Sequence, residues 1–295
     1  MKVKFWGVRG SIPTPGPSTV KYGGNTTCIE VRTDDNDLII LDAGTGIFPM
    51  AMTLFPELPI TCHLFISHTH WDHIQGLPFF IPSFIPGNTL RIHGAYDPID
   101  RRDIREILSG QLQYCYFPVR EAELKARLEY VTLKERQVAQ AGSATVTNIL
   151  MNHPVLCFGY RIECNGKSVF FTGDHEQLYN IYGPDDPEYH EYEQYMTQKN
   201  QAIVEFIRGV DVLIADTSYT VEDYPAKKGW GHSTYDANIA MARAAGVRQV
   251  FFTHHEPTRG DAALEKVFQD AMDRHPRQPG DPEFALAREG LVFEL

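Results

Sequence analysis

Three histidines and one aspartate fall within the six positions 68–73, in a segment that reads Ser-His-Thr-His-Trp-Asp-His from Ser67 to His73. The segment follows the apolar run at 63–66, which predicts a strand, so these side chains should emerge together at a sheet edge. Neutral imidazole and carboxylate bind divalent ions such as Zn²⁺, and two ions about 3.5–4 Å apart can share a bridging hydroxide. The segment therefore predicts a dinuclear metal site.

Such a site needs more ligands than one loop supplies, and three further candidates each lie just beyond a β-branched or aromatic run. They are His153, Asp174 and His254. The chain resembles the metallo-β-lactamase-fold hydrolases in the order of these residues: first the HxHxDH segment, then a histidine, an aspartate and a last histidine. The resemblance spans nearly the whole chain. It implies an α/β layered fold, the αββα sandwich of two mixed β-sheets flanked by helices, as a single domain over residues 1–295. Two successive halves of strands followed by helices favour the same architecture.

The resemblance also implies how the ligands are divided between two metal ions. One ion would be held by His68, His70 and His153, the other by Asp72, His73 and His254, with Asp174 bridging them. His255 is an alternative to His254, although His254 directly follows the threonine that ends its strand. The ligand types suit Zn²⁺ or Mn²⁺, and Fe²⁺ is possible.

Four other stretches resemble narrower groups within these hydrolases. The stretch from Gly231 to Thr234 is similar to the RNase Z-like phosphodiesterases. Asp216, in the stretch 215–218, stands where that branch has a glutamate in a His-Glu-Ala-Thr motif. The segments 5–13 and 22–26 resemble a bacterial subgroup associated with cyclic-nucleotide phosphodiesterase activity. The catalytic set that follows is Asp72, His232 as the proton donor to the leaving oxygen, and Asp216 as the hydrogen-bond partner of His232.

A charged helix is predicted from about residue 98 to residue 108. A second helix is predicted directly after His232. Ser233 is its expected N-cap, Asp236 the acid of a capping box, and Gly246 its C-terminal stop. Free backbone N–H groups at such a helix start favour an anion, so a phosphate would bind well beside His232. The candidate substrate contacts are Asn25, Ser233 and Thr234.

Charge gives the best internal indication of the substrate. The chain has 38 acidic residues against 27 Lys and Arg, a formal net charge of -11. Binding a phosphate backbone relies on Lys and Arg, so long nucleic acids are disfavoured. The region 175–205 is expected to be an acidic, tyrosine-rich insertion or lid, because Asp174 to Tyr195 includes seven acids, five tyrosines and no Lys or Arg.

These observations favour a phosphodiesterase that uses a metal-bridging hydroxide on a small substrate, a 3′,5′-cyclic nucleotide opened to the 5′-monophosphate. Three alternatives stay open: an RNase Z-like nuclease that processes tRNA 3′ ends, a phosphodiesterase of another small cyclic phosphate, and a non-enzymatic nucleotide-binding module. The complete set of seven metal-ligand candidates argues against the last alternative. Related enzymes imply a homodimer.

The chain is expected to reside in the cytoplasm and not in a membrane. No apolar run approaches membrane-spanning length, and Gly7, Arg9 and Gly10 interrupt the first residues before a secretory h-region could form. The five cysteines are an odd number without a CxxC pair, which favours reduced thiols over a disulfide framework.

Overall fold

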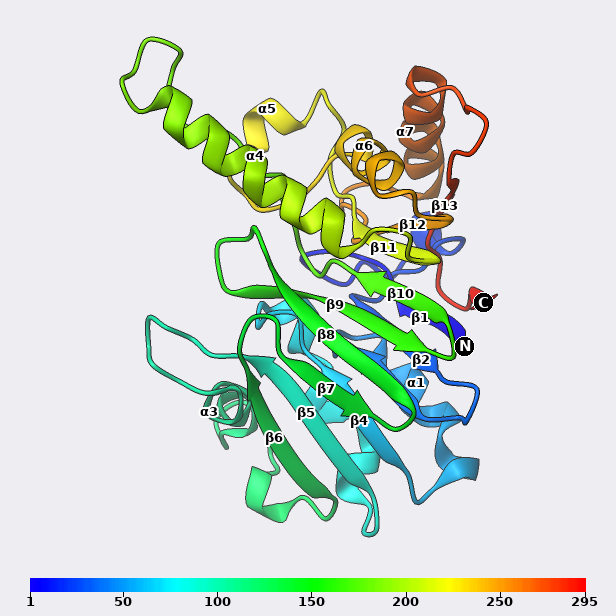
Figure 1. Ribbon diagram of the computed structural model, residues 1–295. Helices are drawn as coiled ribbons and strands as arrows, with labels where there is room; N and C mark the ends of the chain where they lie inside the picture. Colours follow the sequence, from blue (N-terminus) through cyan, green and yellow to red (C-terminus); the bar gives the residue numbers. More distant parts are fainter.

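The computed structural model describes residues 1–295, and it consists of two seven-stranded sheets packed against each other with helices on the outer faces (Figure 1). The strand order is β14-β1-β2-β3-β4-β5-β6 in one sheet and β13-β12-β11-β10-β9-β8-β7 in the other. Both sheets are mixed, because β1, β2 and β14 and likewise β7, β8 and β9 pair antiparallel, whereas β3 to β6 and β10 to β13 pair parallel. The predicted αββα sandwich is confirmed.

The strands of the first sheet are β1 (Lys2–Gly7), β2 (Cys28–Arg32), β3 (Leu38–Leu41), β4 (Thr61–Phe65), β5 (Thr89–Ala95), β6 (Arg127–Leu133) and β14 (Val292–Glu294). Those of the second are β7 (Val138–Ala141), β8 (Ala144–Met151), β9 (Cys157–Cys164), β10 (Lys167–Phe171), β11 (Val212–Asp216), β12 (Gln249–Thr253) and β13 (Glu283–Leu286). The α-helices are α1 (Ile47–Thr53), α2 (Trp71–Ile74), α3 (Ile104–Ser109), α4 (Tyr189–Phe206), α5 (Tyr224–Lys227), α6 (Tyr235–Ala245) and α7 (Asp261–Arg274).

Three apolar clusters hold the layers together. The central cluster lies between the sheets and includes Val31 from one sheet and Tyr160 from the other. A second cluster packs α4, α6 and α7 on the second sheet, for example through Ile239 against Phe252 and its neighbours. A third packs α1 and α3 on the first sheet. Strands covered on both faces must be apolar along their whole length, and the fully buried run Leu38–Leu41 is of this kind.

The fold brings the carboxyl ends of five strands toward one region. Asp216 is the last residue of β11, and the polar residues beyond the ends of β3, β4, β10 and β12 include Asp42, His68, Asp174 and His254, respectively. All five side chains are buried. Parallel strands of α/β sheets commonly present functional groups at their carboxyl ends. This arrangement explains why residues far apart in the chain can form one site.

Two helices begin later than the sequence pattern predicts. The N-cap of α6 is Thr234, whose hydroxyl accepts a hydrogen bond from the N–H of Ala237, so the prediction of Ser233 as N-cap is wrong. The predicted capping acid, Asp236, instead pairs with Arg274 and His275 of α7. A charged helix predicted from about residue 98 starts only at Ile104, where an Asp103–Glu106 capping box supplies the partners for free N–H groups.

The acidic region that follows Asp174 forms an irregular segment and then α4, the longest helix, whose first turns project away from the body of the protein (Figure 1). Buried contacts hold its last turns, where Ile203 joins the cluster under α6. None of the helices combines the length and apolar character needed to cross a membrane.

Two histidines that the sequence does not single out are buried on neighbouring strands of the first sheet. His93 stacks on Phe65 with a centroid distance of 4.3 Å, and on His63 at 5.7 Å. Neither ring nitrogen of His93 has a hydrogen-bond partner. Burial is the main reason that the pKa of His93 is lowered to about 4 and that the pKa of His63 is lowered as well.

This pair predicts a loss of stability in acid. The pKa of His93 is about 4 in the folded state and about 6.5 in the unfolded state. The unfolded state therefore binds the proton more readily, and stability present above pH 6.5 is lost as the pH falls toward 4. We expect the protonation of His93 to lower the free energy of unfolding by about 2 kcal/mol as the pH falls from 7 to 5. Urea unfolding of wild type and His93→Phe at both pH values measures this term, and equal pH dependence in the two proteins would contradict it.

Candidate metal centre

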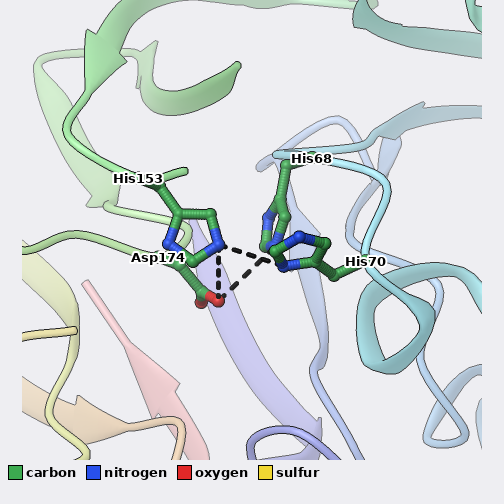
Figure 2. A group of neighbouring side chains, drawn as sticks. All are labelled: His68, His70, His153 and Asp174. Atoms are coloured by element: carbon green, nitrogen blue, oxygen red, sulfur yellow. Dashed lines mark hydrogen bonds and ion pairs between the residues drawn. The ribbon is translucent and has the colours of Figure 1, made fainter. Parts of the chain in front are cut away.

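Seven side chains from distant parts of the chain converge in two adjoining clusters. The ligand atoms within each cluster all lie within 4.8 Å of one another. The first cluster contains His68, His70, His153 and Asp174, and Figure 2 shows His68 and His70 facing His153 and Asp174 from the opposite side. The second contains Asp72, His73, Asp174 and His254. The structure thus brings together all seven residues that the sequence resemblance selects.

Asp174 belongs to both clusters because its two carboxylate oxygens face different histidines. Its Oδ2 lies 3.5 Å from Nε2 of His68 and 3.9 Å from Nε2 of His153. Its Oδ1 lies 3.3 Å from Nε2 of His73 and 3.3 Å from Nε2 of His254. A carboxylate in this position can bridge two cations, one on each oxygen.

The donor atoms fit divalent ions. Nε2 of His68 and Oδ1 of Asp174 are buried and have no hydrogen-bond partner, a costly arrangement for polar atoms unless an ion binds them. Imidazole nitrogen and carboxylate oxygen are ligands for Zn²⁺ and for other divalent transition ions. The clusters are consistent with a dinuclear metal site.

The outward-facing ring nitrogens of the histidines are also occupied. Nδ1 of His73 lies 2.7 Å from Oδ2 of Asp42, and Nδ1 of His153 lies 2.9 Å from the carbonyl oxygen of Gly231. Nδ1 of His254 lies 3.0 Å from the hydroxyl of Ser218. Hydrogen bonds of this kind set the tautomer of a metal-binding histidine and fix its orientation.

Buried charge shifts the protonation of several of these groups. Burial lowers the pKa of His68 and also lowers that of His153, to about 4, so both rings are neutral near pH 7. Burial acts on His73 in the same direction, but Asp174, Asp72 and Asp42 surround it and raise its pKa well above the usual value. Burial would raise the pKa of Asp72, but His73 and His254 lower it instead.

Sequence reasoning missed Asp42, which is fully buried. Its Oδ2 accepts the Oγ–H of Ser67 as well as contacting His73, and its Oδ1 accepts the N–H of Ser67. The signal was available, because Asp42 directly follows the apolar strand 38–41, as His68 follows its own strand. The backbone of Ser11 was also missed, and its N–H donates to Oδ2 of Asp72 at 2.7 Å.

The adjacent histidines at 254 and 255 have different surroundings. His254 points into the second cluster, with Nε2 3.1 Å from Oδ2 of Asp72. His255 is fully buried elsewhere, where its Nε2 donates to the carbonyl oxygen of Ala287 and its ring meets the edge of Tyr22. The geometry therefore brings His254 and not His255 to the cluster.

His232 and Asp216 form a pair beside the clusters. Nδ1 of His232 lies 3.0 Å from Oδ2 of Asp216, which also accepts the N–H of His175. Burial lowers the pKa of His232, but Asp216 and then Asp174 outweigh it and raise the pKa to about 9. The side chain of His232 remains 13% exposed, whereas that of Asp216 is fully buried.

The three residues expected to contact substrate are engaged within the protein. The side-chain amide and backbone N–H of Asn25 both donate to Glu289. The hydroxyl of Ser233 donates to the carbonyl oxygen of His175, and that of Thr234 caps α6. Contact of these residues with substrate stays a prediction.

A family model described as the Beta-lactamase superfamily domain matches residues 38–255, which include all seven of the clustered residues. The chain belongs to this superfamily. It is a metal-dependent hydrolase with the metallo-β-lactamase fold. The match begins at β3 and ends directly after His254, so it covers both halves of the sandwich.

Individual members of the superfamily resemble the chain over most of its length. Ribonuclease Z of Haloarcula marismortui is 24% identical, with 99% of this chain and 96% of the relative aligned. The metallo-beta-lactamase fold protein YhfI of Bacillus subtilis superimposes with a TM-score of 0.67 at 19% identity, covering 99% and 98% of the two chains. Unliganded yeast PDE1 superimposes with a TM-score of 0.65 at 18% identity, covering 100% and 99%. The two structural likenesses support the fold alone.

The close approach of Gly10 to His254 gives a test of the second cluster. A Cβ atom at Gly10 would lie 2.3 Å from Nδ1 and Cε1 of His254, so Gly10→Ala must displace that ring. We expect the affinity for one of two bound ions to fall on the order of 10- to 100-fold. Metal analysis during dialysis against a graded chelator measures the loss. Gly110→Ala is the matched control, because a Cβ there meets nothing within 4 Å; equal affinities in both variants would contradict the assignment.

Proposed function

We propose that the protein is a dinuclear-metal phosphodiesterase. In this proposal His68, His70 and His153 hold one divalent ion, Asp72, His73 and His254 hold the other, and Asp174 bridges them. The observation that carries it is the division of the Asp174 oxygens between the two histidine clusters, with buried ligand atoms that have no other partner. Zn²⁺ and Mn²⁺ are the first candidates and Fe²⁺ is another.

A phosphodiester is a poor electrophile because its negative charge repels a nucleophile. Two bound divalent ions would lower the pKa of a water molecule and offset the phosphate charge. The residues of the chain supply the remaining requirement, a proton for the leaving oxygen. Asp216 occupies Nδ1 of His232, so Nε2 of the same ring is left to donate that proton. Asp216 thereby fixes the ring orientation without contacting the substrate.

The contribution of His232 can be separated from that of the ligands. We expect His232→Ala to retain its metal and to lose turnover by ~10²–10⁴-fold, the usual contribution of general acid–base catalysis. Asp72→Ala should lose metal as well as activity, because it removes a ligand candidate. Metal content and kcat measured on the same preparations distinguish the two variants. Unchanged turnover in His232→Ala would remove this residue from the mechanism.

Two substrate classes are candidates, and different observations favour them. The relative from Haloarcula marismortui is named Ribonuclease Z, which favours an RNA substrate such as a tRNA precursor. The sequence-based preference for a small 3′,5′-cyclic nucleotide draws support from the net charge of -11. The projecting helix α4 adds to this support, because it carries Glu191, Glu193 and Glu205 against the single cation Lys199. Of the two, the comparison with named relatives favours RNA and the surface charge favours the small substrate.

The two candidates give different products in one assay. The purified protein, with its metal content measured and Mn²⁺ or Zn²⁺ added, is incubated in parallel with a tRNA precursor and with purine and pyrimidine cyclic nucleotides. An RNase Z-type activity releases a 3′ trailer from the precursor, whereas the other activity yields a 5′-monophosphate. In both cases we expect Asp72→Ala to abolish product formation. Turnover that persists in Asp72→Ala would contradict the proposed metal centre.

A further inference from the structure

Glu176 is a buried carboxylate, 2% exposed, that the site described above does not use. Its Oε1 accepts the hydroxyl of Tyr224 at 2.7 Å and the N–H of Gly229 at 2.9 Å. Its Oε2 accepts the N–H of Gly231 at 2.9 Å and that of Gly229 at 3.1 Å. All of these donors belong to one segment, residues 224–231, which consists of the short helix α5 and the turn that leads into His232; we call this segment the loop 224–231.

The loop is shaped for this carboxylate. Gly229 and Gly231 have φ angles of +89° and +87°, in the left-handed region that favours glycine. Both N–H groups converge on Glu176, and backbone N–H groups that converge in this way form a binding site for an anion. The two lysines of the loop also make contacts: Lys228 lies over the ring of Tyr179, and Lys227 lies over the ring of Tyr219 and pairs with Glu256 at 3.8 Å.

Glu176 is itself fixed to the strand end that carries His153. Its N–H donates to the carbonyl oxygen of Asn152 at 2.9 Å, and the Asn152 side-chain amide donates to its carbonyl oxygen at 3.0 Å. The loop also contacts His153 directly, because the carbonyl oxygen of Gly231 lies 2.9 Å from Nδ1 of His153. Glu176 is thus hydrogen-bonded both to the loop that leads into His232 and to Asn152, the neighbour of His153.

We infer that Glu176 is a positioning residue, which holds the loop 224–231 so that His232 can deliver its proton to the leaving oxygen and His153 keeps the tautomer that exposes Nε2. The inference rests on the proposed function, in which His232 is the general acid. Glu176→Gln would retain the shape of the side chain but replace one acceptor oxygen by an NH₂ group. Whichever oxygen is replaced, that group would face the N–H of Gly229, which cannot accept its hydrogen bond.

The loop itself provides a test that does not depend on activity. We expect Glu176→Gln to speed amide hydrogen exchange in the peptide covering residues 222–232 by at least about tenfold, since the carboxylate no longer holds the loop closed. Glu222→Gln is the matched control, because Glu222 lies at the start of the same segment and is exposed. Equal exchange in the two metal-free variants would overturn the inference, whatever the enzyme hydrolyses.

The leaving group tests whether Glu176 acts through His232. Bis(p-nitrophenyl) phosphate releases a stable phenolate that needs no proton, whereas RNA and cyclic nucleotides release an alkoxide. We expect Glu176→Gln to lower kcat on the alkoxide substrate about 10- to 100-fold, with little change in KM, and to stay within about threefold of wild type on the p-nitrophenyl ester. Equal losses on both substrates would contradict a role through His232. A wild type inactive on both would refute the proposed function and leave the exchange test to decide the inference.

A double-variant cycle completes the test. If Glu176 acts by placing His232, combining Glu176→Gln with His232→Ala should lower kcat no further than His232→Ala alone, because residues that act as one unit are not additive. Multiplied losses would overturn the inference. Tyr224→Phe removes one hydrogen bond to Glu176 and leaves the two backbone donors in place. We expect Tyr224→Phe to lower kcat on the alkoxide substrate more than on the p-nitrophenyl ester, by a smaller factor than Glu176→Gln does. This variant keeps the role of Glu176 testable if Glu176→Gln does not fold.

Discussion

The structure depends on a buried carboxylate, Asp174, shared between two groups of histidines. Bringing this many polar groups out of water is unfavourable unless opposite charge or ligation compensates for it. The ligand atoms lie within 4.8 Å of one another in each cluster, and two of them have no partner in the protein. A pair of divalent cations would provide the missing compensation, so the fold and its ions should stabilise each other.

Around this centre, carboxylates recur in a supporting role. Asp42 orients His73, Asp216 orients His232, and Glu176 holds the loop that precedes His232. Each of the three is 2% exposed or less, and each acts on a neighbour of the site. The same physical principle applies to all three. A buried carboxylate needs hydrogen bonds from N–H or O–H donors, so it fixes the position of the side chain or backbone segment that donates them.

The centre itself does not distinguish between the two candidate substrates. The clusters and the His232–Asp216 pair suit any phosphodiester, because they address the phosphate and the leaving oxygen. Helix α4, which projects from the body of the protein, carries more acids than bases (Figure 1). Relatedness to Ribonuclease Z and the acidity of this helix point in different directions.

The sequence by itself determined the sandwich class and the seven residues of the clusters through its resemblance to the metallo-β-lactamase-fold hydrolases, which rests on ligand-type side chains placed directly after apolar strands. It failed at the starts of two helices: the choice between Ser233 and Thr234 as N-cap depends on which hydroxyl has a competing partner, and His175 offers one to Ser233. Only the tertiary structure decided between His254 and His255, because the ring of His255 is held by the carbonyl oxygen of Ala287, from a distant segment of the chain. Only the tertiary structure revealed Asp42 and Glu176 as supports, because the groups that hold them come from segments far apart in the chain.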